Sequence, residues 1–286
     1  MAKLRTGRML GRSRWGNFIM FSLLILCGAF MVLPIVYSIL QSFKPLNEIN
    51  LFPPRFFVTR PTLSNYGKLF QLSANLWVPF SRYVFNSVFV SVVVTALNVI
   101  IASMCAYPLA KYTFPGSKLI FRTIVVALLF SSQVTYIPQY VLLSRMGMIN
   151  TYWAMILPPL ASTLGLYLMR QYMIAIPDSL MEAAKLDGAG EYRIFWQIIM
   201  PNVKPAWLTL MIFSFQAVWN SANNTYIYKE QLKTLPTVMS QLAAGGVARV
   251  GVGAASSVIL MLPPVLLFVF TQTNIIDTMA TSGMKD

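Results

Sequence analysis

Residues 177–201 form the stretch that decides the fold, and they read PDSLMEAAKLDGAGEYRIFWQIIMP. The first half predicts a short helix: Ser179 and Glu182 have the spacing of a capping box, and Gly188 occupies the position of a left-handed stop residue. A second helical segment is expected to begin near Glu191 and to end before the final proline. Because long apolar runs flank this polar stretch, it predicts a two-helix loop between membrane spans.

The first of these two helices is expected to present a small apolar surface. Leu180, Ala183 and Ala184 have the spacing of one helix face, with Glu182 at its edge. Such a smooth face on a loop between spans is suited to insertion into a socket on a partner protein. The alternative is an ordinary amphipathic helix that lies at the membrane interface.

The spacing within the stretch resembles the EAA loop of ABC importer permeases, whose pattern is E-A-A-x3-G-x9-I-x-L-P. Glu182-Ala183-Ala184, Gly188, Ile198 and Met200-Pro201 match it, with methionine in the usual position of leucine. Methionine conserves volume and helix propensity at that position. The resemblance implies that this loop is a coupling helix seated on an ATPase, with contacts from Asp178, Glu182, Ala183, Ala184, Asp187, Gly188 and Ala189.

The composition is that of an integral membrane protein. The 286 residues are 57% hydrophobic and only 10% charged, and a soluble domain has about 25% charged residues. The net charge of +14 comes from basic residues that flank apolar runs, which favours orientation in a membrane over nucleic-acid binding. The chain has no histidine, and its two cysteines, Cys27 and Cys105, are expected to be reduced packing residues. We therefore expect no metal in this chain.

Six apolar runs predict an all-α integral membrane fold with six transmembrane helices and the EAA loop, residues 175–201, between spans four and five. The expected spans are residues 16–42, 83–110, 122–144, 147–169, 205–227 and 253–276. Residues 1–14 form a basic N-terminal segment, and residues 15–286 form one permease domain. The paired prolines at 158–159 and 263–264 are interpreted as structural kinks.

The distribution of basic residues predicts the orientation of the chain. In this topology 13 of the 22 Lys and Arg residues lie on the side of the N-terminus and the EAA loop, and nine lie on the other side. Basic residues concentrate in cytoplasmic segments. Both termini are therefore expected in the cytoplasm of a cell with a bacterial-type plasma membrane.

The centres of the expected spans contain no Asp, Glu, Lys or Arg. This argues against an ion-coupled carrier and against an enzyme acting inside the membrane. The spans instead offer amides, hydroxyls and aromatic rings, which suit a neutral polyhydroxyl solute. The residues expected to face a pathway are Asn86, Gln133, Tyr136, Gln139, Gln216, Trp219 and Asn220. The alternative for each of them is hydrogen bonding between helices.

Nearly the whole chain resembles the smaller six-span permease subunit of maltose-type carbohydrate importers. The resemblance implies four kinds of partner: a second permease subunit, two cytoplasmic ATPase subunits, an extracytoplasmic solute-binding protein, and a sugar or oligosaccharide. The chain lacks a P-loop, so ATP and Mg²⁺ are expected in the partner ATPases. The alternatives are a permease for an amino acid, glycerol phosphate or phosphate, and a membrane assembly protein without transport activity.

Overall fold

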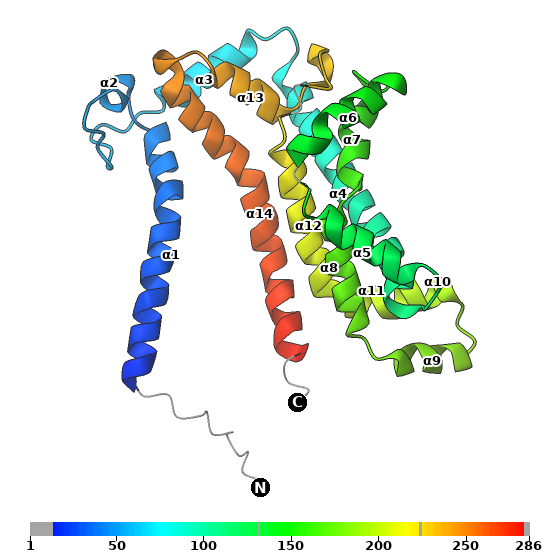
Figure 1. Cartoon of the computed structure of the whole chain (residues 1–286). Coiled ribbons are helices and arrows are strands. Elements are labelled where there is room, and N and C mark those ends of the chain that lie inside the picture. The colour runs from blue at the N-terminus through cyan, green and yellow to red at the C-terminus, as the bar shows by residue number, and fades with distance from the viewer. Residues whose placement is uncertain (1–13, 131, 223–224, 283–286) are drawn as a thin grey trace.

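The computed structural model describes residues 14–130, 132–222 and 225–282, and within these residues it contains helices and loops but no strand (Figure 1). The predicted all-helical class is thus confirmed. The helices of the first half are α1 (Arg14–Ser42), α2 (Leu46–Ile49), α3 (Ser64–Ala74), α4 (Phe80–Lys111), α5 (Ser117–Ala127), α6 (Ser132–Arg145) and α7 (Tyr152–Leu160).

The second half begins with α8 (Thr163–Ile174), α9 (Asp178–Leu186) and α10 (Glu191–Ile194). The π-helical turn Phe195–Ile199 joins α10 to α11 (Met200–Asn202), and α12 (Lys204–Trp219) follows. The last helices are α13 (Leu235–Ala243) and α14 (Val250–Ser282), each preceded by a 3₁₀ turn, at Glu230–Leu232 and Val247–Arg249.

Three single helices are long and apolar enough to cross a membrane: Trp15–Ser42, Phe80–Lys111 and Val247–Gln272. Two bent pairs qualify if each pair is one crossing. The first pair is α7 with α8, bent by 41°, and the second is Glu191–Asn202 with α12, bent by 79°. By length and composition, the described residues therefore contain three to five candidate spans.

The run expected as a continuous third span, residues 122–144, consists of two helices instead. α5 ends at Ala127 and α6 begins at Ser132. Two serines occupy positions 131 and 132, and such short polar side chains compete with the backbone hydrogen bonds of a helix. Apolar composition alone does not show such a break.

The bend between α7 and α8 follows the first proline pair, at residues 158–159. Proline removes a helical N–H donor, and the amide Nδ2 of Asn98 donates to the Pro159 carbonyl at 3.2 Å. The structural interpretation of this proline pair is confirmed. The second pair, at residues 263–264, lies inside the continuous helix α14.

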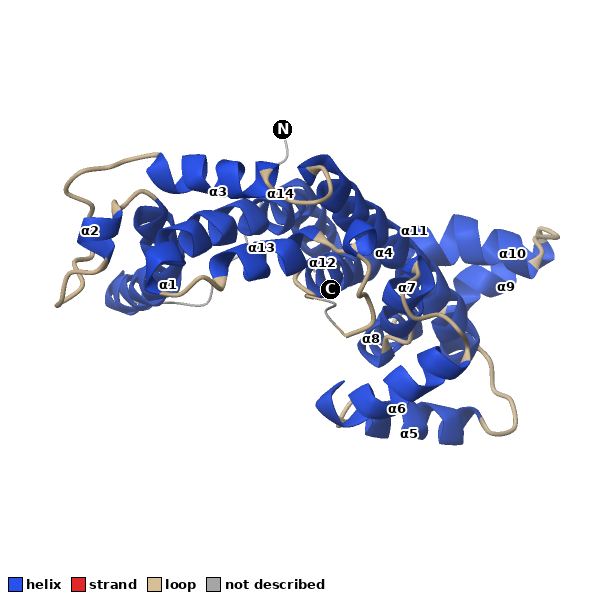
Figure 2. Ribbon diagram, turned by 90° about the horizontal axis from the view of Figure 1, so that it is seen from above, coloured by secondary structure: helices blue, strands red, loops and turns tan. Residues whose placement is uncertain are grey.

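Most of the helices pack into one body, and α1 lies to one side of it (Figure 1). α4 packs against α8, α12 and α7, while α14 packs against α12, α13 and α1. Figure 2 shows that α1 and α9 lie at opposite ends of the elongated molecule. In Figure 1, α2, α3 and α13 lie at one end of the long helices, and α9 and α10 lie at the other.

The two cysteines do not pack inside the chain. Both Cys27 and Cys105 are exposed, so the expectation that they are packing residues is wrong for this chain alone.

Candidate functional site

Helix α9 begins two residues earlier than a capping box at Ser179 requires. Its first residue is Asp178, Pro177 precedes it, and no side chain caps its N-terminus. The predicted capping by Ser179 is therefore wrong, and Glu182 is exposed. The first turn is held instead by Lys111 at the end of α4, which forms an ion pair with Asp178 at 2.8 Å. Lys111 also donates to the Ile176 carbonyl.

The end of α9 has the predicted glycine stop. Gly188 has φ +76°, a left-handed conformation that glycine adopts without a steric penalty. Its N–H donates to the Lys185 carbonyl at 3.0 Å, and the N–H of Ala189 donates to the Ala184 carbonyl at 2.9 Å. These two bonds form a Schellman motif. A Cβ at Gly188 would meet nothing within 4 Å, so this position opens away from the chain.

The two alanines of α9 lie on different sides of the helix. Ala184 is 8% exposed and packs, together with Met181, in the core cluster that includes Met173 and Ile194. Ala183 is exposed, as is Leu186 at 89%. The expectation that Ala184 shares an open face with Leu180 and Ala183 is therefore wrong. Sequence spacing places the three residues together but does not show which part of that face the rest of the chain covers.

Glu191, the first residue of α10, joins α9 and α10 to α4. The Tyr107 hydroxyl donates to its Oε2 at 2.9 Å, and the Tyr112 hydroxyl donates to the same oxygen. Lys185 of α9 forms an ion pair with Oε1 at 3.0 Å. The Tyr112 hydroxyl and then Lys185 lower the pKa of Glu191, because both stabilise its charged form. This cluster was not predicted, since Tyr107 and Tyr112 lie 84 and 79 residues before Glu191 in the sequence.

The second helical segment does not end before Pro201, contrary to the prediction. It passes from α10 through the π-helical turn into α11, which ends at Asn202. Pro201 is the second residue of α11 and follows the π-helical turn after one residue. The chain then bends by 79° into α12, and the indole of Trp207 donates to the Met200 carbonyl across the bend at 3.2 Å.

A cavity of about 730 Å³ lies beside α7 and the bend between α7 and α8. It brings together two residues of the predicted pathway, Tyr136 and Gln139 of α6, and adds Tyr226, which was not predicted. The Tyr226 hydroxyl donates to Gln139 Oε1 at 3.0 Å, and its ring centroid is 5.8 Å from that of Tyr136. The other described lining residues are Ala127, Phe130, Thr135, Ala154, Met155, Pro158, Pro159, Ala161, Thr163 and Ser221.

Two other predicted pathway residues bind their own chain. Asn86 is fully buried, donates to the carbonyls of Gln231 and Lys233, and accepts from the Tyr152 hydroxyl at 2.7 Å. Trp219 is 3% exposed, and its indole donates to the Leu260 carbonyl at 2.9 Å. These contacts match the alternative of hydrogen bonding between segments of the chain.

The remaining predicted pathway residues are not gathered at the cavity. Gln216 and Asn220 are exposed near the end of α12. Gln133 lies in α6, and its side chain is outside the described part of the structure.

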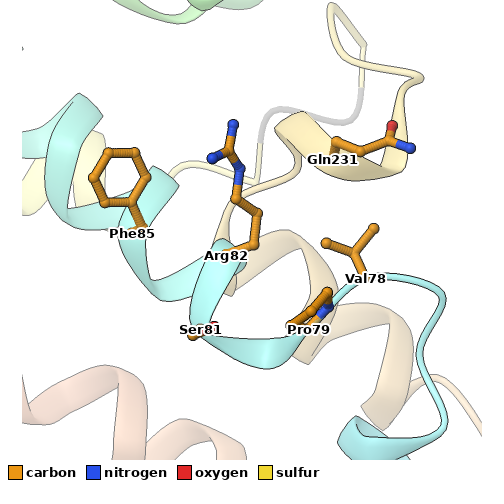
Figure 3. A pocket seen from close by; sticks show the side chains of 6 residues that line it. All are labelled: Val78, Pro79, Ser81, Arg82, Phe85 and Gln231. Carbon is orange, nitrogen blue, oxygen red and sulfur yellow. The ribbon is translucent and has the colours of Figure 1, made fainter.

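A shallow surface pocket of about 520 Å³ lies where α4 begins. Figure 3 shows Arg82 standing between Phe85 and the turn that carries Gln231. The guanidinium carbon is 5.6 Å from the Phe85 ring centroid, and Nη2 donates to the Tyr152 hydroxyl at 3.3 Å. The other residues that line this pocket are Val78, Pro79 and Ser81. Tyr152 thus links the positive charge at this end of α4 to Asn86.

Comparison with known proteins gives a match over almost the whole chain. The model of the family described as "Binding-protein-dependent transport system inner membrane component" matches residues 6–280. The arabinooligosaccharides transport system permease protein AraQ of Halalkalibacterium halodurans is 30% identical over 258 residues, covering 89% of this chain and 91% of the relative. The diacetylchitobiose uptake system permease protein NgcG of Streptomyces coelicolor is 29% identical over 275 residues, covering 92% of this chain and 87% of that protein.

A solved structure shares the fold. The crystal structure of a bacterial ABC transporter involved in the import of the acidic polysaccharide alginate contains a chain that superimposes with a TM-score of 0.74 at 20% identity. The match covers 93% of this chain and 99% of that one.

Proposed function

Because the chain belongs to the inner membrane components of binding-protein-dependent transport systems, we propose that it is one permease subunit of an ABC importer for a sugar or oligosaccharide. It forms the pathway together with a second permease subunit, and a solute-binding protein delivers the solute. Two ATPase subunits, which bind ATP and Mg²⁺, drive transport from the cytoplasm. The relatives named for arabino-oligosaccharides and diacetylchitobiose support an oligosaccharide as the solute.

The observation that carries this proposal is the geometry of α9. One side of the helix is anchored in the chain's own core by Met181 and Ala184, and the other side is open. Gly188 ends the helix without a side chain that would obstruct a partner. We assign the ATPase contact to the open side and to the helix end, with Asp178, Glu182, Ala183, Asp187, Gly188 and Ala189 as contact residues.

The remaining residues of the stretch transmit the movement of α9 to the spans. Ala184 supports α9 from within. Lys111, Tyr107 and Tyr112 hold the start of α9 and the start of α10 to the end of α4. α4 in turn packs against α8 and α12. A shift of α9 on ATP binding therefore moves these helices as one body, which is how packed elements respond to a local displacement.

The proposal includes six crossings, with α5 and α6 together making the third. Residues 15–286 form the permease domain, preceded by the basic N-terminal residues 1–14, most of which lie outside the described part of the structure. Both ends of the chain and α9 are placed in the cytoplasm, and α2, α3 and α13 are placed outside. Twenty residues suffice for one crossing, and residues 122–144 reach that length only when α5 and α6 are taken together.

Co-purification from the native membrane in mild detergent tests the proposal. We expect mass spectrometry to recover a second multi-span permease, a P-loop ATPase and an extracytoplasmic binding protein. Crosslinking from the exposed Leu186 of α9 should capture the ATPase. Recovery of this chain without an ATPase, even after crosslinking, would overturn the proposal, and α9 would then be an interfacial helix.

A further inference from the structure

The loop between α2 and α3, residues 50–63, presents an exposed aromatic ring between two positive charges. Phe57 is 74% exposed, and Arg55 and Arg60, on either side of it in the sequence, are exposed as well. These two arginines are the only ionisable side chains of the loop. Basic residues around an exposed aromatic ring are typical of segments that bind the surface of an anionic membrane.

The shape of this loop is fixed by bonds to buried side chains. Lys44 is 2% exposed, and its Nζ donates to the carbonyl of Arg55. The N–H of Thr59 donates to Oε1 of Glu48 at 2.9 Å, and Glu48 is 6% exposed. Because these bonds order the backbone on both sides of Phe57, the loop keeps the ring of Phe57 on its surface.

Two aromatic residues of α1 mark the limits of the hydrocarbon layer. Trp15 begins the candidate span, and Tyr37 follows it by 22 residues. That spacing corresponds to about 33 Å of α-helix, which is close to the thickness of a hydrocarbon core, about 30 Å. Trp and Tyr rings concentrate at the two membrane–water interfaces. Tyr37 therefore lies at the outer interface in the topology proposed above.

The loop returns to the level of Tyr37 after the chain has left α1. The ring centroid of Phe56 is 5.6 Å from that of Tyr37, and the ring of Phe57 is 5.3 Å from that of Phe56. Figure 1 shows the loop after α2 descending beside the end of α1. Figure 2 places α2 and this loop on the far side of α1 from α4 and α12. The position is suited to contact with lipid.

We propose that residues 50–63 form an interfacial anchor in the outer leaflet, in which Phe57 inserts among the lipid headgroups and Arg55 and Arg60 bind the phosphates of anionic phospholipids. An irregular backbone cannot enter the hydrocarbon core, because its N–H and C=O groups would lack partners there. The loop therefore stays in the hydrated headgroup layer, where it fixes the height and tilt of α1. This inference goes beyond the transport function and rests on α1 as a span.

Fluorescence quenching in reconstituted vesicles tests the anchor. The assembled complex carries C27A, C105A and F57C, and the fluorophore NBD is attached to the new cysteine. The same complex without F57C gives the background signal that is subtracted. The vesicles contain equal parts of phosphatidylcholine and phosphatidylglycerol, and a small fraction of one of the two lipids carries a spin label close to its headgroup.

The matched control is W77C, labelled in the same way. Trp77 is 97% exposed and belongs to the segment that joins α3 to α4. Figure 1 places this segment above α3, away from the long helices. Because both positions carry exposed aromatic rings on the same side of the membrane, they differ in their height above it.

We expect spin-labelled lipid to quench the fluorophore at F57C several-fold more strongly than at W77C, and aqueous iodide to give the opposite order. Quenching at F57C should be stronger with spin-labelled phosphatidylglycerol than with spin-labelled phosphatidylcholine. Adding R55Q and R60Q should remove this preference and leave quenching by phosphatidylcholine. The backbone bond from Lys44 survives R55Q, because it is made to the carbonyl of that residue.

Lipid quenching at F57C that is no stronger than at W77C would overturn the anchor. Strong quenching by iodide would then place the loop in water, and protection from both quenchers would place it against a partner protein. Equal quenching by the two spin-labelled lipids, or a preference that persists with R55Q and R60Q, would overturn the role of the arginines. Recovery of the ATPase with the chain tests the importer function separately, so the two failures are distinguishable.

Discussion

Gly188 is the single residue whose replacement is expected to uncouple the transporter. The change Gly188→Asp puts a side chain into a left-handed position, at a cost of roughly 1–2 kcal/mol, and extends a charge into the space that faces away from the chain. We expect normal membrane insertion and a loss of uptake of more than about tenfold, equivalent to about 1.4 kcal/mol of docking free energy. Uptake in intact cells, together with the amount of chain in the membrane, measures both effects.

Gly190→Asp is the matched control for this change. It introduces the same charge two residues further on, where φ is −72°, so it strains no left-handed backbone. We expect a smaller effect on uptake than that of Gly188→Asp. Near-normal uptake with Gly188→Asp would refute the assignment of α9 as the ATPase contact.

Glu191 is expected to make the loop between α9 and α10 sensitive to acid. Its pKa is lowered in the folded chain by Tyr112 and Lys185, so its charge stabilises the fold above the ordinary value and ceases to do so as pH falls through the lowered value. Glu191→Gln should lower the free energy of unfolding by less than about 1 kcal/mol at neutral pH, because the ion pair is half exposed.

Thermal unfolding of the purified chain between neutral pH and pH 3 checks this expectation. The wild type should lose stability over the acidic end of the range, and Glu191→Gln should lose less there because glutamine does not titrate. Equal pH profiles for the two proteins would show that the cluster around Glu191 does not contribute to stability.

At the scale of the helix, the two alanines of α9 separate the inner from the outer side. Ala184→Leu adds volume to a packed core and should destabilise the chain by about 1–3 kcal/mol, because Ala184 is buried. Ala183→Leu adds the same volume to the exposed side and should leave stability unchanged while weakening ATPase binding. Thermal unfolding of the chain and ATPase recovery on co-purification measure the two effects, and identical behaviour of both variants would refute the two-sided helix.

The elements of this loop show which features were predictable from sequence. The left-handed stop at Gly188 was predicted correctly, because a glycine that follows an amphipathic segment commonly ends a helix in this conformation. The capping box was not formed, because Lys111, which is distant in sequence, holds Asp178 in the first turn. The continuation of the second helix through Pro201 depends on the π-helical turn before it, and no local residue pattern predicts such a turn.

For the molecule as a whole, apolar composition predicted the helical class, and the pairing of polar side chains was not predictable. Asn86 and Tyr136 have similar signals in the sequence, since both are polar residues within apolar runs. In the structure the side-chain amide of Asn86 donates to the carbonyl of Gln231, in the 3₁₀ turn Glu230–Leu232, and to the carbonyl of Lys233, the residue after that turn. Tyr136 instead lines a cavity. Which of the two meets a solute depends on contacts across more than 140 residues.

The crossing made by α5 and α6 decides the topology of the whole chain, and two positions report on it. Phe52, 95% exposed after α2, and Leu186, 89% exposed in α9, lie on opposite sides of the membrane if α5 and α6 cross together. In a cysteine-free background, an impermeant maleimide should label F52C on intact spheroplasts and L186C only after permeabilisation. Without that crossing the two cysteines would share one side, because one fewer crossing separates them. Figure 1 places α6 at the end of the long helices opposite α9, which favours the six-span topology. Labelling of both positions on intact spheroplasts would refute it and would place α9 out of reach of any cytoplasmic ATPase.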